Sequence, residues 1–268
     1  MRRRIWLLVV LVVLVTAGCF EGTRTIRVKA DGSGTIVDTL VLGDQMNAMM
    51  GMDAANQDAE AKAKEKAKGE AAALAMGPGV TLVSDERSAS GIKTTFAFKD
   101  VSTLKVGVSP GPEGDEGPGQ KKEQPLTFRL ARQGAKSVLT VVQPKPPAAP
   151  AEAGTPPAEA GAGGEAPDLG EMGQAMWTMM KPMMKGLRLK TVLEVDGPVA
   201  KTNSPFAQGS AITLLELDFD QIAADEANFK KFTKAGDDPA TMDPKLLQGV
   251  KGIKVSPHAE VVIEFTGR

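Results

Sequence analysis

The chain has 268 residues, of which 42% are hydrophobic and 24% charged, and its formal net charge is −1. This composition excludes a fully disordered chain and a protein that crosses a membrane many times. A single Cys and a single His also exclude an internal disulfide, a thiolate cluster and a metal site built on several His.

The N-terminus has the parts of a secretory signal peptide. Three arginines, Arg2–Arg4, precede an apolar run, Ile5–Val15, and small residues follow. As a helix, the roughly 14 residues of the apolar region would extend about 21 Å, which is short against a hydrocarbon core of about 30 Å. We therefore expect residues 1–18 to be a cleaved signal peptide.

The only cysteine follows these small residues directly. The tetrapeptide Thr16–Cys19 resembles the lipobox of bacterial lipoproteins, with Thr16 where Leu is most frequent. In that family the Cys thiol carries a diacylglycerol, and the chain is cut before the Cys and acylated there. The resemblance implies at least two acyl chains on Cys19, which is enough for stable anchoring. A secreted protein cut after Ala17, with an unmodified Cys, is the alternative.

The charge of the processed chain limits its partners. Without the three arginines it has 29 basic and 33 acidic residues, a net charge near −4. This acidic balance argues against binding to nucleic acid, and it offers no cluster of basic residues that would strengthen membrane binding. Phe20 stands where Asp retains some lipoproteins at the inner membrane. We expect the bacterial cell envelope, with an outer-membrane or periplasm-facing position if the organism is Gram-negative.

The mature chain divides by composition. We expect residues 19–22 to form a lipidated spacer and residues 23–268 to form one domain. Two segments, 107–124 and 144–167, consist largely of Gly, Pro, Ala and charged residues and cannot bury enough apolar surface to offset the entropy of ordering. They are expected to be mobile. Two small domains on either side of 144–167 are the alternative.

The domain begins with a predicted β-hairpin and a predicted helix. Asp31–Gly34 separates two strand-like runs, because Asp and Gly suit the positive φ angles of tight turns. The segment Asp44–Met76, rich in Ala, Lys, Glu and Met, predicts a long helix that ends at Gly77. The charged residues of its second half are typical of a solvent-exposed face.

Strands and short helices are expected in the rest of the chain. The predicted strands are Val80–Ser84, Ile92–Lys99, Pro125–Arg132, Lys136–Gln143, Leu187–Val195, a short one near Val199, Ala211–Phe219 and Glu260–Thr266. The predicted helices are Asp168–Lys185, Asp220–Lys234 and Asp243–Gly249. In the seventh strand, Thr213, Leu215, Leu217 and Phe219 would share one face. Strands with helices between them and no repeated strand-helix period predict an α+β fold with a mostly antiparallel sheet.

Two stretches carry a family resemblance. Arg24–Gly34, with its Asp-Gly-Ser-Gly turn, and Leu187–Asp220 resemble blocks of uncharacterised bacterial envelope lipoproteins, loosely of the LppM-like group. The resemblance implies an exposed domain made of a sheet with helices that contacts or handles lipid. It covers about a fifth of the chain and brings no catalytic residues.

The most unusual feature of this sequence is the arrangement of its methionines. Within Asp168–Lys185, Met172, Met176, Met179 and Met183 recur at helical spacing, with Trp177 beside them. Met46, Met49 and Met50 would share this Met-rich face if it forms a groove. Three interpretations are open: ordinary core packing, an adaptable groove for an acyl chain or a partner helix, and a Cu(I) site of thioethers.

No motif of an enzyme is present. The sequence lacks a nucleophile elbow, a P-loop, a dinucleotide fingerprint and a metalloprotease helix. The acidic pairs Asp218/Asp220 and Asp237/Asp238 stand where helix N-caps are expected. We therefore predict a non-catalytic, lipid-anchored envelope lipoprotein without cofactor or metal, which binds a lipid or an envelope protein through its Met-rich face. A Cu(I)-binding periplasmic lipoprotein is the alternative.

Overall fold

The computed structural model describes residues 20–43, 59–88, 90–110, 124–134, 136–144, 181, 184–234, 247 and 249–267. Their fold is α+β, as the sequence predicts, with strands in the majority. In chain order the elements are β1 (Phe20–Val28), β2 (Gly34–Leu42), α3 (Ala59–Met76), β3 (Thr81–Ser88), β4 (Gly91–Phe98), η2 (Val101–Thr103), β5 (Lys105–Val106), β6 (Leu126–Gln133), β7 (Lys136–Val142), β8 (Leu187–Val195), β9 (Val199–Thr202), β10 (Ala207–Gln208), β11 (Ala211–Asp218), α5 (Phe219–Ile222), α6 (Glu226–Lys234), β12 (Ile253–Val255) and β13 (Glu260–Thr266).

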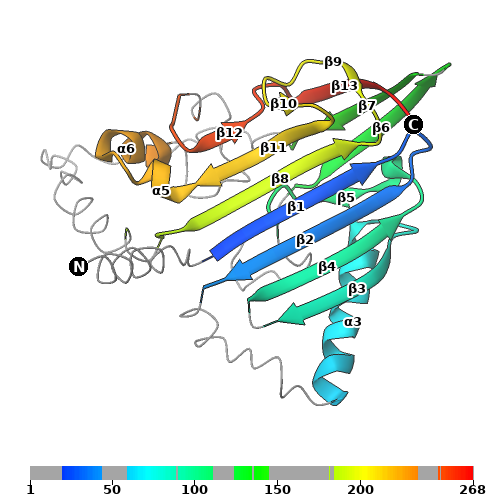
Figure 1. Ribbon diagram of the computed structural model, residues 1–268, viewed down its shortest axis with the longest axis horizontal. Coiled ribbons are helices and arrows are strands. Elements are labelled where there is room, and N and C mark those ends of the chain that lie inside the picture. The colour runs from blue at the N-terminus through cyan, green and yellow to red at the C-terminus, as the bar shows by residue number, and fades with distance from the viewer. Residues whose placement is uncertain are drawn as a thin grey trace, which may run out of the picture.

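The strands form two sheets (Figure 1). In the larger one, sheet A, the order is β10-β11-β8-β1-β2-β4-β3, and β12 pairs with β11. In the smaller one, sheet B, it is β5-β6-β7-β13-β9. The pairing of β1 with β8 is parallel, and the other described pairs are antiparallel. Both sheets contain strands from before and after the 144–167 segment, so these two parts of the chain share one main core.

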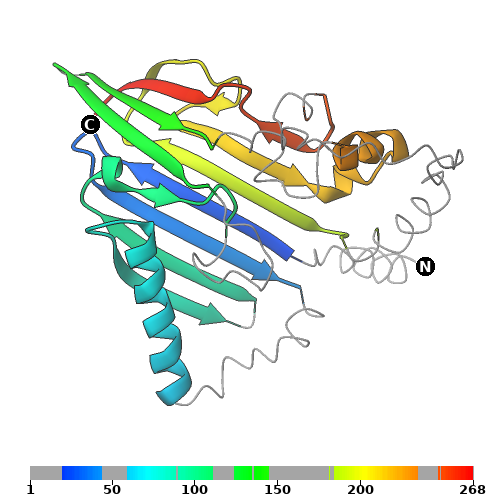
Figure 2. The ribbon, with the colours of Figure 1, turned by 180° about the vertical axis from the view of Figure 1, so that it is seen from behind.

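Sheet A has two unlike faces. Seen from behind in Figure 2, sheet B and α3 lie over one face, which we call the inner face. Alternation along β1 buries Gly22, Arg24, Ile26 and Val28 on this face, while the residues between them are partly or fully exposed on the outer face. The main core joins the inner face to sheet B and the C-terminal end of α3, with fully buried members that include Ile26, Ile36, Met76, Leu139, Leu193, Ile263 and Phe265.

The predicted hairpin is present, and its turn is fixed by an aspartate. Asp31 Oδ1 accepts hydrogen bonds from the backbone N–H of Ser33 at 2.9 Å and from its hydroxyl at 2.6 Å. These bonds hold the pKa of Asp31 below its usual range. Gly32 has φ 83°, the left-handed conformation that an Asp-Gly turn needs. The Val101 N–H donates to the Gly32 carbonyl at 2.8 Å and joins this turn to η2.

The helix α3 ends where predicted, at Met76, and is followed by Gly77 with φ 134°. Its apolar stripe is short: Ala72, Ala73 and Met76 are buried in the main core. The lysines of its N-terminal half are exposed, which confirms the prediction of a solvated face. The earlier part of the predicted helix, residues 44–58 with Met46, Met49 and Met50, lies outside the described residues.

The strand β11 differs from its prediction because it contains a bulge. Thr213 pairs with Val192, but Leu215 pairs with Thr191, so Leu214 is an extra residue. Thr213 therefore lies on the outer face, whereas Leu215 and Leu217 lie on the inner face. The prediction that they share a face is wrong, since a strict period of two fails across a bulge. Phe219 begins α5 instead of ending the strand.

Other boundaries also differ. The helix expected over 220–234 is two helices, α5 and α6, with a break at 223–225, although Phe229 and Phe232 are buried as predicted. The short strands β5, β10 and β12 were not predicted. Of the helix expected over 168–185, the structure describes Lys181 and residues 184–185, and Gly186 follows with φ 75°.

Candidate functional site

The sequence-predicted site residues lie outside the described residues. These are the lipidation site Cys19 and the Met-rich face, namely Met46, Met49, Met50, Met172, Met176, Trp177, Met179 and Met183. Their described neighbours in sequence are informative, however. Phe20 is the first residue of β1, and Met184 packs against a hydrophobic cluster under β11.

Polar side chains cross the inner face of sheet A in a single row. The strand register places Thr191 beside Arg24, Arg24 beside Asp38, Asp38 beside Thr94, and Thr94 beside Asp85. We call this set the polar row. It runs over β8, β1, β2, β4 and β3 at right angles to the strands, and its β8 end meets Leu215 of β11.

The centre of the polar row is an ion pair whose arginine is fully buried and whose aspartate is nearly so. The side chain of Arg24 has no exposed surface, and that of Asp38 is 14% exposed. Nε and Nη2 of Arg24 each donate to one oxygen of Asp38, both at 2.7 Å, which is the two-pronged geometry that an arginine forms best with a carboxylate. Nη1 donates to the Gly107 carbonyl at 3.0 Å. A buried charge is tolerated because its donors are satisfied in this way.

The segment after β5 covers the pair. The Val108 carbonyl accepts a hydrogen bond from the Thr191 hydroxyl, and the Gly107 carbonyl accepts from Arg24. A Cβ on Gly22 would lie 3.0 Å from Pro110 Cγ, so glycine leaves the room that this segment occupies. We expected residues 107–124 to be mobile. The first residues of this segment, 107–110, are described, and the polar row donates hydrogen bonds to the carbonyls of Gly107 and Val108; the mobility of the segment stays a prediction.

At its other end the polar row reaches the protein surface. Asp85 accepts hydrogen bonds from the Thr94 hydroxyl at 2.8 Å and from Arg87 Nε at 3.0 Å. Arg87 also donates to Glu65 of α3 at 2.6 Å, and these side chains are 15–24% exposed. The row thus fastens α3 to the edge strand β3.

Apolar side chains continue on the inner face beyond the polar row. A second cluster packs under the end of β11 and includes Leu217, Phe219, Phe229 and Leu247, with Met184, Leu187 and Leu189 packed against it. Among the described residues, Phe20, Leu40 and Ile92 lie on the same side of the row, partly exposed, and belong to neither cluster. The polar row therefore separates the main core from a second apolar region.

Three acidic residues near α5 and α6 have structural partners, whereas Asp237 and Asp238 lie outside the described residues. Asp218 caps α5, and its Oδ1 accepts from the Gln221 N–H at 3.2 Å, as predicted. Asp220 accepts from the Gly186 N–H at 2.9 Å, and Asp225 from the Ala227 N–H at 2.9 Å. Among the described residues, no three His, Cys, Asp or Glu side chains gather as a possible metal site.

One expectation about the start of the mature chain can be compared with the structure. Residues 20–22, expected to be a spacer, are strand residues paired with β2 and β8. The spacer prediction failed because Phe20-Glu21-Gly22 shows no strand alternation. Within the described part of the chain, no helix has the length and apolar character needed to cross a membrane.

The comparisons with known proteins give one weak likeness. No protein-family model and no curated protein matches the chain. The folded domain of the Mycobacterium tuberculosis LppM protein, solved by NMR, aligns over 94% of this chain and 91% of that chain, at 8% sequence identity and a TM-score of 0.28. A TM-score this low does not establish a shared fold. It assigns neither the family nor the function of this chain.

Proposed function

We propose that this chain is a non-catalytic lipoprotein of the bacterial cell envelope, held at a membrane by acyl chains on Cys19. The observation that carries the proposal is the N-terminal sequence: basic residues, a short apolar run, and the only cysteine of the chain placed after Thr16, Ala17 and Gly18. Two acyl chains provide the stable anchoring that a single chain does not.

Membrane fractionation tests the tether. The wild-type chain, expressed in a bacterium that processes lipoproteins, is expected in the membrane fraction and to incorporate radiolabelled palmitate. The Cys19→Ala variant should lose the palmitate label completely. A wild-type chain that takes up no label, or an equally labelled variant, would refute the tether.

We further propose that the domain binds a lipid or an envelope protein through its Met-rich face. The support comes from Met184, which follows that segment directly and packs against the second cluster with Leu187 and Leu189. Met184 thus contacts the apolar region beyond the polar row. Flexible thioether side chains suit a surface that adapts to acyl chains of different shape.

Lipid extraction tests the lipid form of this proposal. The wild-type chain, purified in a mild detergent, should carry phospholipid beyond its own covalent acyl groups, and Met176→Lys with Met179→Lys should remove most of it. The matched control is Ala63→Lys with Ala67→Lys, which adds the same two charges on the exposed side of α3. Equal lipid content in all three proteins would contradict lipid binding by this face. Protein captured by the wild type and the control, but not by the Met variant, would favour the protein partner.

A further inference from the structure

No linker separates the proposed lipidation site, Cys19, from the folded sheet, because β1 begins at the next residue. Phe20 pairs with Leu42 of β2 and with Leu187 of β8, so the strand is paired on both sides from its first residue. Consecutive Cα atoms are about 3.8 Å apart. An acyl-bearing Cys19 would therefore hold this end of sheet A within a few ångströms of the lipid headgroups.

We propose that this end of sheet A, which we call the tether end, rests on the bilayer surface, with the strands rising away from it. The tether end comprises the start of β1, the end of β2 and the start of β8, and it lies on the left in Figure 1. The inference rests on the proposed lipidation and adds to it an orientation and a contact surface. Its partner is a phospholipid bilayer.

The surface chemistry of the tether end suits an interface with headgroups. Val41, next to Glu21 on the adjacent strand, is 43% exposed, and Phe20 and Met184 are partly exposed. Exposed basic side chains lie on the same end, at Lys185 and Arg188. Apolar side chains at such a position can enter the headgroup region, and the long stem of an exposed lysine can lie along it while its ammonium group stays in water.

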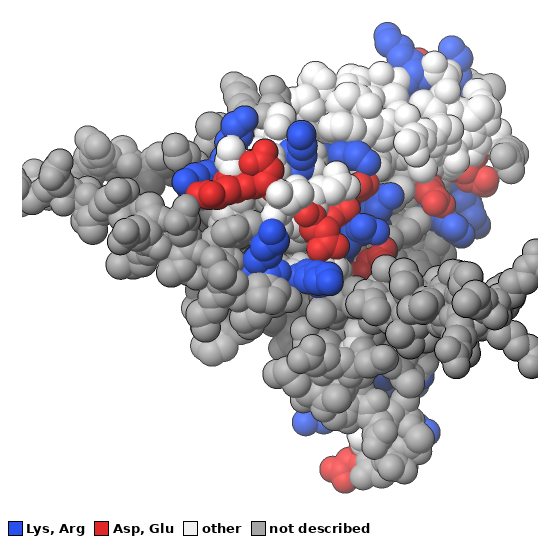
Figure 3. Space-filling model, turned by 60° about the vertical axis from the view of Figure 1, so that its left-hand side comes forward, with Lys and Arg blue, Asp and Glu red and all other residues white. Residues whose placement is uncertain are grey.

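Among the described residues near this end, basic side chains are paired with acidic ones, so we infer that the tether and not electrostatic attraction holds the contact. In Figure 3, where this side of the molecule is turned forward, the described surface that the view leaves uncovered shows basic and acidic groups interleaved. Arg188 pairs with Asp218 at 3.1 Å, and Lys190 and Lys254 both pair with Glu216, at 3.5 and 3.0 Å. Such a surface is neither strongly attracted nor strongly repelled by a bilayer.

The opposite end of sheet A is polar. It carries the hairpin turn with Lys29, Asp31 and Ser33, and Lys29 is exposed. At about 3.3 Å per residue, β1 separates the two ends by roughly 26 Å. Two other large apolar side chains are exposed among the described residues, Leu74 of α3 and Val83 of the edge strand β3. They define a competing arrangement, in which the domain lies on its β3 edge.

Fluorescence quenching in vesicles distinguishes these arrangements. The wild-type chain has no other cysteine, so a fluorophore attached to an introduced cysteine is unique once Cys19 is acylated. The lipidated variants Val41→Cys, Lys29→Cys and Val83→Cys are reconstituted in vesicles of phosphatidylethanolamine and phosphatidylglycerol, with and without headgroup-labelled quencher lipid. All three positions are exposed, and each variant's folding is checked by its unfolding midpoint.

The proposal predicts several-fold stronger quenching at Val41 than at Lys29, with Val83 also weakly quenched. Equal quenching at Val41 and Val83 would overturn it in favour of a side-on domain. Weak quenching at all three positions, in protein that floats with the vesicles, would overturn the orientation while leaving the tether intact. Protein that does not float with vesicles would refute the tether itself, and with it the orientation.

Discussion

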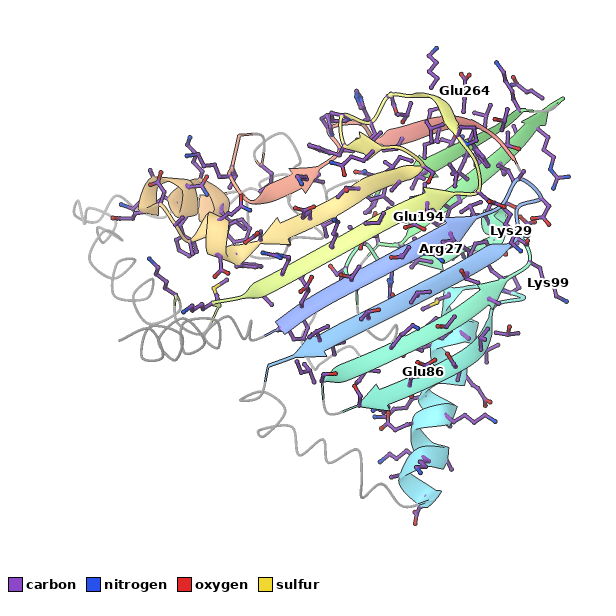
Figure 4. All side chains as sticks on the ribbon, in the orientation of Figure 1. Arg27, Lys29, Glu86, Lys99, Glu194 and Glu264 are labelled. Atoms are coloured by element: carbon purple, nitrogen blue, oxygen red, sulfur yellow. The ribbon has the colours of Figure 1, made fainter. Side chains whose placement is uncertain are left out.

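The two faces of sheet A use the same pair of side-chain types in opposite ways. Arg24 and Arg27 lie three residues apart on β1, and each binds a carboxylate of a neighbouring strand at 2.7 Å. On the inner face, Arg24 and Asp38 are 0% and 14% exposed; on the outer face, Arg27 and Glu194 are 64% and 34% exposed. Figure 4 labels the outer pair, on the adjacent strands β1 and β8. Because water screens the outer pair, equal distances do not mean equal energies.

Burying the inner pair costs desolvation free energy, and removing one of its partners costs more stability than the pair itself provides. Desolvation offsets much of its Coulomb attraction, so the pair as a whole adds little stability over apolar residues of the same size. Its location explains its effect on the architecture. Arg24 binds the Gly107 carbonyl, and the polar row around the pair lies between the main core and the second apolar region.

The largest expected effect comes from removing one partner of the inner pair. Asp38→Leu leaves the Arg24 charge buried without its carboxylate and should lower the free energy of unfolding by about 3–5 kcal/mol. Urea denaturation of the chain from Phe20 onward measures it. The double variant Arg24→Met with Asp38→Leu should recover most of the loss. A loss below about 1 kcal/mol in Asp38→Leu would show that the pair is hydrated in solution.

A smaller effect is expected from adding volume on the inner face. In Gly22→Val the new side chain meets Pro110 and Leu189, since a Cβ alone would lie 3.0 and 3.1 Å from them. The free energy of unfolding should fall by about 1–3 kcal/mol. Thr23→Val, one residue along β1 on the outer face, is the matched control and should be nearly neutral. Equal losses in both variants would remove the distinction between the faces at this position.

The outer pair should contribute little. Arg27→Met is expected to change the free energy of unfolding by less than about 1 kcal/mol, because both partners are largely solvated. The same denaturation experiment at low salt and in about 1 M NaCl should show the wild type approaching the variant as screening increases. If Arg27→Met lowered the free energy of unfolding by several kcal/mol at both salt concentrations, the conclusion that water screens this pair would be wrong.

The smallest effect concerns the acid dependence of the hairpin turn. Hydrogen bonds from Ser33 lower the pKa of Asp31 from 3.8 in the folded chain. Below about pH 4 the unfolded chain therefore binds more protons, and this contribution to stability, present at higher pH, is lost as pH falls through the folded pKa. Asp31→Asn and Ser33→Ala should both flatten the slope of unfolding free energy against pH in this range. An unchanged slope in both would contradict the cause given for the pKa shift.

Much of the sheet was predictable because alternation and turn residues are local signals. The strands Leu187–Val195 and Glu260–Thr266 have the predicted bounds, and Val261, Ile263 and Phe265 share the buried face. The pairing of β1 with β8 was not predictable, since nothing in either strand specifies a partner so distant in sequence. The bulge at Leu214 was not predictable for a related reason, because it depends on how two strands pair.

The sequence indicates one member of the polar row, but it does not show which residues the row brings together. Alternation through Ile26 and Val28 already places Arg24 on the buried face, and a charge at such a position is a signal. Its partner Asp38 becomes evident once the hairpin register is known. Glu65 and Arg87, by contrast, come together only through the packing of α3 on the edge strand. The candidate Met-rich face remains a prediction, because its residues lie outside the described part of the chain.

The intact mass of the processed chain tests the central claim, the tether at Cys19, most directly. Mass spectrometry of protein extracted from the membrane fraction should give the mass of residues 19–268 increased by at least two acyl chains. The N-terminal peptide should place that increase on Cys19. A different first residue, or a free thiol on Cys19, would contradict the tether and the orientation derived from it.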